Sequence, residues 1–253
     1  MPRIARKKSE SKIYHIMIRG IDQQNIFHDE ADYEKFIAIL SKYQKMAYYD
    51  LFAYCLMGNH VHILIREGKE ALSNSIKRIG VSYVSWYNWQ YQRKGPLFQG
   101  RYKSEPVEDD SYFLTVLRYI HQNPLKAGLT EDITDYPWSS YIEYLNPPKI
   151  VNIEYTLQMF DSNKHQAIER FKKFNQETNH DQCLEVAKTI ATLSDKVIRQ
   201  LVAKNFLIEL ATLKNNDTVT RDKVLKFLKR LDGCSLRQVS RLTGISVYKI
   251  FKL

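Results

Sequence analysis

The hydrophobic residues of the first half of the chain follow two spacings. A spacing of two is typical of strands, and a spacing of three to four is typical of helices. These spacings predict strands at 13–20, 51–57, 60–65 and 97–107, and helices at 29–49, 70–92 and 111–122. The order predicts an α+β fold, an antiparallel sheet of about four strands with helices packed on it.

Turn and cap residues set the limits of these elements. Asp29 is a plausible N-cap of the first helix, and Asp109-Asp110-Ser111 precedes the last one. Met57-Gly58-Asn59 predicts a tight turn, which makes the second and third strands antiparallel neighbours. Pro124 is expected to stop the last helix, because proline disfavours a helical conformation in the residue before it.

The third strand carries His60-Val61-His62 within the apolar run YCLMGNHVHILI. Side chains alternate along a strand, so His60 and His62 point to one face, while Val61, Ile63 and Ile65 pack on the other. Two neutral imidazoles side by side form half of a divalent-metal site. The alternative is a pair of hydrogen-bonded strand histidines, and an isolated HxH pattern does not distinguish the two.

The segment SYFLTVLRYIHQNP, residues 111–124, predicts a second group of functional side chains. Asn123 follows Tyr119 by four residues, so both project from the same side of a helix. A phenol and an amide oxygen are therefore presented together near a helix C-terminus. Alternatively, Tyr119 lies at the edge of the core and Asn123 caps the helix.

Charge and composition favour a polyanionic partner. The chain has 253 residues, a formal net charge of +10, 17 tyrosines and 11 phenylalanines. Nucleic acid is the first expectation and an acidic membrane surface the second. No apolar run is long enough to span a bilayer, and the basic N-terminus lacks the apolar core of a signal peptide. Three well-separated cysteines indicate reduced thiols in a cytosolic protein.

Three basic residues are candidates for contact with a nucleic-acid strand. Arg19 ends the first predicted strand beside Gly20, where a phosphate can approach the backbone closely. Arg101 and Lys103 are two apart in the fourth predicted strand and are therefore expected on one face, together with Glu105. A plain surface position is an equally good interpretation of Arg19.

The composition changes after residue 145, where Asn146-Pro147-Pro148 is the best linker. We therefore expect a domain at 1–145 and a helical region at 146–253. Within the latter, residues 235–253 resemble a helix-turn-helix, with Ser235 and Ser246 as caps and a turn at Thr243-Gly244-Ile245. Lys249 and Lys252 are available for phosphate. A helical bundle packed on the first domain is the alternative.

Four segments of the chain also resemble a known family. RGIDQQNIF (19–27), LMGNHVHILI (56–65), LFQGRYKS (97–104) and RYIHQNPLKAGL (118–129) occur in the order found in single-tyrosine transposases of the HUH superfamily. They are most similar to the IS200-like, REP-associated tyrosine transposase branch. The resemblance covers about the first 145 residues and implies a ferredoxin-like nuclease fold.

The resemblance implies a role for each candidate. His60 and His62 match the histidine pair that binds a divalent metal, Asn123 the third ligand, and Tyr119 the nucleophile on single-stranded DNA. His121 or Gln122 remains an alternative to Asn123. Imidazoles with an amide oxygen suit Mg²⁺ or Mn²⁺, and Mn²⁺ better matches the imidazoles. The implied DNA is single-stranded and associated with hairpins.

The expected function is therefore that of a transposase or site-specific endonuclease that forms a 5′-phosphotyrosine intermediate. Two alternatives are a catalytically inactive DNA-binding regulator that uses the helix-turn-helix, and a metal hydrolase that uses water. A homodimer and an active site shared between subunits both remain open. We expect a cytoplasmic, nucleoid-associated bacterial protein without contact with a membrane.

Overall fold

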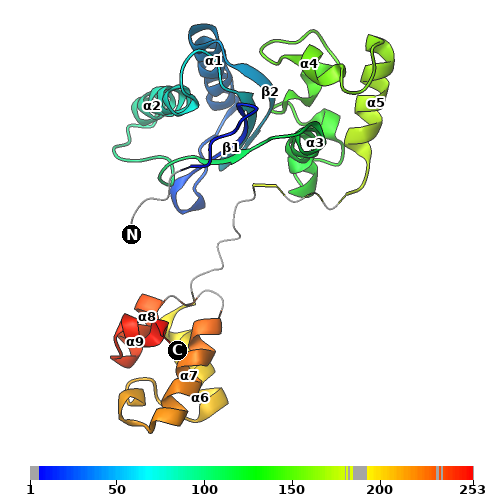
Figure 1. Ribbon diagram of the computed structural model, residues 1–253. Helices are drawn as coiled ribbons and strands as arrows, with labels where there is room; N and C mark the ends of the chain where they lie inside the picture. The colour runs from blue at the N-terminus through cyan, green and yellow to red at the C-terminus, as the bar shows by residue number, and fades with distance from the viewer. Residues whose placement is uncertain are drawn as a thin grey trace. The chain divides into compact units, whose positions relative to one another are not determined.

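The computed structural model describes residues 6–179, 181, 183–184, 193–231, 234 and 236–252 (Figure 1). The contacts divide the chain into two compact units, Met1–Leu184 and Glu185–Leu253. Each unit has its own hydrophobic core. We therefore describe each unit by itself.

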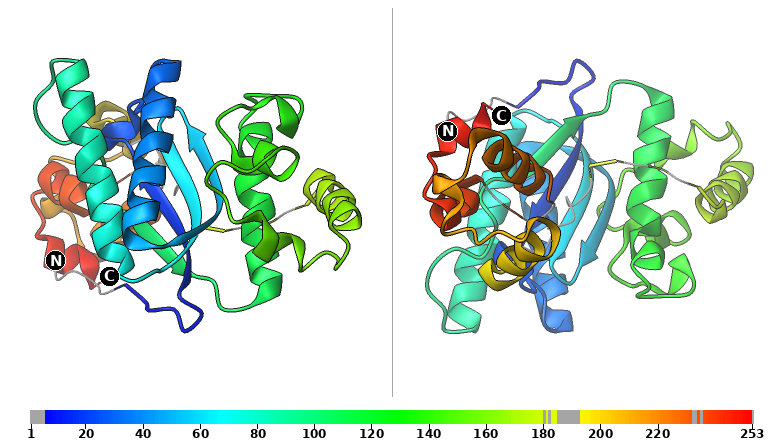
Figure 2. Two further views of the ribbon diagram at one scale, coloured as in Figure 1. Left: turned by 90° about the horizontal axis from the view of Figure 1, so that it is seen from above. Right: turned by 90° about the horizontal axis from the view of Figure 1, so that it is seen from below.

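The first unit is built on a four-stranded antiparallel sheet in the order β2-β3-β1-β4. The strands are β1 (Ile13–Arg19), β2 (Asp50–Met57), β3 (His60–Arg66) and β4 (Lys103–Pro106). Two helices, α1 (Glu30–Ala47) and α2 (Leu72–Gln90), cover one face, and α3 (Asp110–Lys126) covers the other (Figure 2). This ferredoxin-like arrangement confirms the predicted α+β fold.

The fourth strand is shorter than the predicted strand at 97–107. Residues 97–102 run irregularly along the end of β1, where Gln99 N–H donates to the Arg19 carbonyl at 2.8 Å and Gly20 bridges to Phe98. Gly100 has a φ of +68°, a left-handed conformation that interrupts an extended strand. The alternation expected from residue 97 onward therefore begins only at Lys103.

The prediction that Pro124 stops α3 is wrong, because the helix continues to Lys126. Gly128, at a φ of +69°, provides the end. Its N–H donates to the Leu125 carbonyl, and the Leu129 N–H donates to the Pro124 carbonyl, both at 3.0 Å. These two bonds form a Schellman motif, which satisfies carbonyls that the helix end would otherwise leave unpaired.

The boundary between the units also differs from the expected one after residue 145. The short helices α4 (Ile153–Leu157) and α5 (Lys164–Gln176) belong to the first unit. The Phe171 ring stacks on Tyr144 at a centroid distance of 4.2 Å, and Asn152 N–H donates to the Leu51 carbonyl at 2.7 Å. The expected linker lies inside the first unit, and the Glu143 carboxylate accepts the N–H groups of residues 149–151 that follow it.

The second unit is helical. It contains α6 (Asp195–Phe206), α7 (Thr218–Arg230), α8 (Leu236–Thr243) and α9 (Val247–Phe251). Gly244 turns the chain between α8 and α9 at a φ of +68°, and the Ser246 side chain caps α9. The other expected cap, Ser235, lies outside the described residues. Short 3-10 turns complete the two units, at Ile21–Gln23, Ile133–Asp135, Ser140–Tyr144 and Leu213–Asn215.

Across the described part of the chain, we find no helix that combines the length and the apolar character needed to cross a membrane.

Candidate active site

The histidine pair lies on the face of the sheet that α3 covers. In β3, His60 is opposite Arg19 of β1, and His62 is opposite Met17 of β1 and Cys55 of β2. The two imidazole centroids are 5.0 Å apart. Val61, Ile63 and Ile65 are fully buried, as expected for the packing side of the strand. The strand therefore presents both imidazoles on the same side.

Helix α3 brings Tyr119 and Asn123 to this pair. The Asp109 carboxylate caps the helix by accepting the Tyr112 N–H at 2.7 Å, and a buried apolar stripe fixes the rotation of the helix against the sheet. The Tyr119 ring lies 5.5 Å from the ring of His62. The Asn123 side chain lies near enough to His60 to raise the pKa of that imidazole. The four side chains therefore meet at one place, and all come from one chain.

The hydrogen bonds orient both imidazoles in the same sense. His60 Nδ1 lies 2.6 Å from the Asn59 Oδ1 atom, an oxygen that can only accept, so the proton is on Nδ1. His62 Nδ1 lies 2.9 Å from His15 Nε2. When His62 Nδ1 is the donor, its Nε2 keeps a lone pair, and this buried atom has no hydrogen-bond partner. Both rings then present Nε2 as a ligand atom.

Burial keeps these histidines neutral at pH 7. It lowers the pKa of His60 to about 4, and the charge of Arg19 acts in the same direction. It also lowers the pKa of His62 well below 6.5, with the neighbouring histidines contributing. Neutral imidazole is the form that coordinates a metal.

The residues at this site fit an open metal site. Two imidazole nitrogens and the Asn123 amide oxygen are available as ligands, and the unpartnered Nε2 of His62 is a buried polar atom without a protein partner. Among the residues that the structure describes, no group of three or more His, Cys, Asp or Glu side chains is arranged to hold a metal ion. Water and phosphate oxygens would have to complete the coordination of Mg²⁺ or Mn²⁺.

The two alternatives to Asn123 serve a different part of the fold. His121 lies 3.1 Å through Nδ1 from Asn175 Oδ1 and 3.0 Å through Nε2 from Ser140 Oγ. Gln122 donates to the backbone carbonyls of Asn175 at 2.7 Å and Glu177 at 3.0 Å. Both side chains are buried and fix α3 to the segment around α5. The hydrogen-bonding atoms of His121 and Gln122 are therefore engaged away from His60 and His62.

The basic candidates separate into two groups. Arg19 lies beside His60, and the exposed Lys103 is opposite Met17 on the same face of the sheet. Arg101 precedes β4 and lines a cavity beneath α2 instead. The expectation that Arg101 and Lys103 share one face is wrong, because Arg101 lies in the irregular segment where strand alternation does not hold.

Sequence reasoning missed two side chains near the site. His15 of β1 is fully buried and packs against both His62 and Tyr119, with its ring 5.9 Å from the tyrosine ring. Lys126, one turn after Asn123 on α3, places its Nζ 5.6 Å from the Tyr119 ring centroid. A histidine in an otherwise apolar strand was a signal, because a buried polar group requires a partner.

The comparisons with known proteins agree with the expected family. Residues 8–123 match the family described as transposase, IS200 like. A proposed REP-associated tyrosine transposase of Haemophilus influenzae is 25% identical over 104 residues, which is 37% of this chain and 59% of the relative. The chain thus spans less than two thirds of this relative's length. The family resemblance predicted from the four segments is confirmed.

Two solved structures are similar to part of the chain. One is a REP-associated tyrosine transposase bound to a REP hairpin, with 16% identity, a TM-score of 0.49, and coverage of 57% of this chain and 86% of that chain. The other is a proposed transposase from Deinococcus radiodurans, with 16% identity, a TM-score of 0.34, and coverage of 48% and 97%.

Proposed function

We propose that this protein cleaves and rejoins single-stranded DNA beside hairpins. Residues 8–123, which match the IS200-like transposase family, support this proposal. The observation that carries this proposal is the position of Tyr119, whose ring lies 5.5 Å from His62 while Asn123, on the same helix, lies near His60. A nucleophile and a set of metal ligands meet there. All four side chains belong to one chain, so the proposed site needs no second subunit.

In the proposed reaction, the Tyr119 oxygen attacks the scissile phosphorus. A bond from phosphorus to the tyrosine oxygen forms, the bond to the 3′ oxygen breaks, and that oxygen leaves as a free 3′-OH after taking up a proton. The phenol loses its proton in the same step. Because the 5′-phosphotyrosine is an ester, a 3′-OH can attack it in reverse, and the strand is rejoined without ATP.

The other side chains hold and orient the phosphate. His60, His62 and Asn123 are the proposed ligands of Mg²⁺ or Mn²⁺. A bound divalent cation polarises the phosphate oxygen and neutralises the charge that develops there. Arg19 lies beside His60 and can bind a phosphate oxygen of the strand, while Lys126 places a second cation near the Tyr119 ring.

A covalent-adduct assay tests the proposal. The full chain is incubated with Mg²⁺ or Mn²⁺ and 5′- and 3′-labelled hairpin oligonucleotides from DNA flanking its own gene, then resolved under denaturing conditions. We expect an adduct that carries the label from the 3′ side of the cut, and none with Tyr119→Phe. Tyr112→Phe, on the same helix, is the matched control and should retain the adduct.

The metal ligands give a second reading in the same assay. EDTA, His60→Ala and His62→Ala should each prevent adduct formation while binding of the oligonucleotide persists. Absence of an adduct on every flanking hairpin, or an adduct that persists in Tyr119→Phe, would contradict the proposed chemistry.

The second unit supports a separate role in binding duplex DNA. Helices α8 and α9 are joined by the Gly244 turn, and the exposed side chains of Lys249 and Lys252 are available for phosphate. We propose that Lys249 and Lys252 contact the phosphates of the DNA backbone. Helix α9 has only five residues, which is short for a helix that reads bases in the major groove. Lys249→Ala with Lys252→Ala should weaken duplex binding, whereas His60→Ala and Tyr119→Phe should leave it unchanged.

A further inference from the structure

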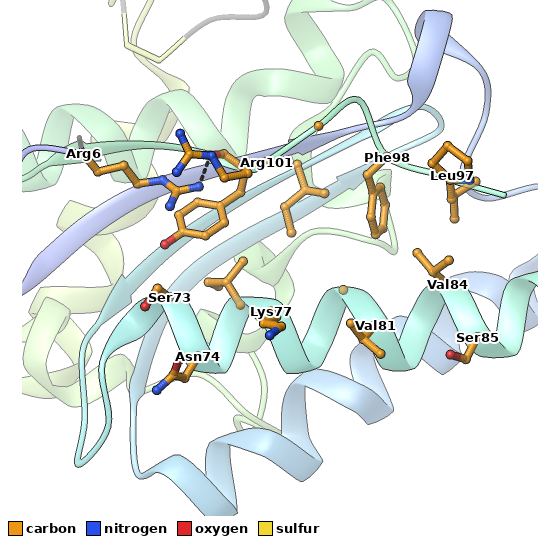
Figure 3. Close-up of a pocket in the computed structure, with 16 residues that line it drawn as sticks. Arg6, Ser73, Asn74, Lys77, Val81, Val84, Ser85, Leu97, Phe98 and Arg101 are labelled. Atoms are coloured by element: carbon orange, nitrogen blue, oxygen red, sulfur yellow. Dashed lines mark hydrogen bonds between the residues drawn. The ribbon is translucent and has the colours of Figure 1, made fainter. Parts of the chain in front are cut away.

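A cavity of about 600 Å³ lies on the other face of the sheet, between α2 and residues 96–102 (Figure 3). Its volume is within the range of small-molecule sites in proteins. Apolar side chains from both sides make most of its wall, including Ile18, Ile76, Val84 and Leu97. Nothing in the proposed cleavage reaction uses this space.

An aromatic ring and a glycine meet at the wall of the cavity. Phe98 packs near-parallel to Tyr83, with ring centroids 6.3 Å apart, so it is supported from the core side. Gly80 lies opposite on α2, and a Cβ built there would be 3.8 Å from the Phe98 ring. Glycine weakens a helix interior. Because 3.8 Å is ordinary van der Waals contact, the Gly80 backbone already covers this edge of the ring, and a planar group would stack on the part of Phe98 that lines the cavity.

The charges around the cavity are of one sign. Arg6, Lys77 and Arg101 line it, and none of the described lining residues is Asp or Glu. Arg6 is held in place by Tyr102, since its guanidinium lies 3.6 Å from the ring centroid and donates to the backbone carbonyl at 3.0 Å. Figure 3 shows the Arg6 and Arg101 side chains close together at one end of the cavity. The cavity therefore suits a ligand with a flat apolar part and an anionic part.

The cavity is connected to the candidate active site through β1. Ile18 lines the cavity, whereas the next residue, Arg19, lies beside His60 on the opposite face. The wall of the cavity is fixed to the same strand end, because Ile21 N–H donates to the Leu97 carbonyl at 2.9 Å. Arg19 and the wall of the cavity therefore lie at the same end of β1, on opposite faces of the sheet.

We infer that this cavity takes an unpaired nucleobase of the single-stranded DNA substrate, stacked on Phe98, with the adjoining phosphate bound by Arg6 and Arg101. This inference rests on the proposed function, because it presumes a single-stranded substrate. Stacking on an aromatic side chain together with a cationic groove is a general way to hold single strands. An unpaired base can enter such a cavity at little cost, because no base pair has to open.

Filling the cavity tests the inference. Gly80→Leu places a side chain beside Phe98 and removes the glycine from the helix, and Gly80→Ala is the matched control. Phe98→Leu removes the stacking surface instead. All variants are made in the full chain with Tyr119→Phe and measured in EDTA, so cleavage does not affect binding. The probes are a fluorescein-labelled 12-mer of mixed sequence and a fully abasic 12-mer, followed by fluorescence anisotropy.

We expect Gly80→Leu and Phe98→Leu to weaken binding of the mixed 12-mer about tenfold, the range for one stacked base. Binding of the abasic 12-mer should stay unchanged, and Gly80→Ala should resemble the parent on both probes. Arg101→Gln should weaken binding of both probes and reduce the slope of log affinity against log salt by about 0.7, the value for one phosphate contact on a single strand.

Wild-type binding of the mixed 12-mer by both cavity variants would overturn the inference, and so would an equal loss on the abasic probe. The proposed cleavage is judged separately by the Tyr119-dependent adduct. If an adduct forms and Gly80→Leu binds normally, the inference about the cavity is wrong and the proposed cleavage stands. If binding weakens only for the probe that carries bases and no adduct forms, the cavity binds a base and the proposed cleavage is wrong.

Discussion

Replacing His15 with leucine should weaken metal binding without touching a proposed ligand. His15 Nε2 lies 2.9 Å from His62 Nδ1, and both rings are buried. Leucine leaves the His62 N–H without an acceptor, so the ring is no longer held with Nε2 directed toward the site. His15 is thus a positioning residue in the proposed site.

The expected magnitude follows from this single bond. Loss of the partner that orients a ligating histidine typically costs 10–100-fold in metal affinity, or about 1.4–2.7 kcal/mol. An unsatisfied buried N–H also costs about 1–3 kcal/mol of folding free energy. The second loss is smaller in His15→Asn, because its amide oxygen offers an acceptor again.

Mn²⁺ binding to the full chain measures the effect directly, by calorimetry or by the loss of the free-ion resonance signal. The Tyr119→Phe background excludes cleavage, and urea unfolding reports stability on the same samples. Cys55→Ala is the control, because Cys55 is opposite His62 on β2 and its thiol bonds to Met57 instead of the ring. Mn²⁺ affinity in His15→Leu within twofold of the parent would refute the reasoning.

Two further predictions concern stability. Glu143→Gln should lower the free energy of unfolding by about 3 kcal/mol, since the carboxylate accepts three backbone N–H groups from residues 149–151 and the Tyr54 hydroxyl; an equal effect of exposed Glu154→Gln in urea unfolding would argue against this reason. Burial lowers the pKa of His121 to about 4. As the pH falls from 6.5 to 4, His121 is therefore protonated in the unfolded chain but stays neutral in the folded chain. Stability therefore declines over this interval, and His121→Gln should make the decline shallower by up to about 1.4 kcal/mol per pH unit, unlike exposed His165→Gln.

The site could be predicted where a regular element carries the side chains. Alternation along β3 placed His60 and His62 on one face, and the four-residue spacing in α3 placed Asn123 one turn after Tyr119. Neither spacing shows which element the other meets, so the contact between them followed from the family resemblance and the structure. His15 escaped notice because its partner lies 47 positions away in the chain.

Other predictions failed where a local signal competed with another. Pro124 favours a helix end, but Gly128 offers the left-handed residue at which the Schellman motif forms, and the helix continues to it. Asn146-Pro147-Pro148 has the composition of a linker, yet the buried Glu143 carboxylate ties down the residues after it. Arg101 follows an irregular course that a two-residue period cannot describe.

Helix α3 has a consequence for how the proposed reaction would proceed. Tyr119 and Asn123 project from one side of this helix, while His121 and Gln122 anchor the other side to Asn175 and the end of α5. These hydrogen bonds would have to break before α3 could swing its nucleophile away from α5. In the proposed cycle, we therefore expect the DNA to move between cleavage and rejoining. A new 3′-OH end would be brought to a phosphotyrosine that stays in place.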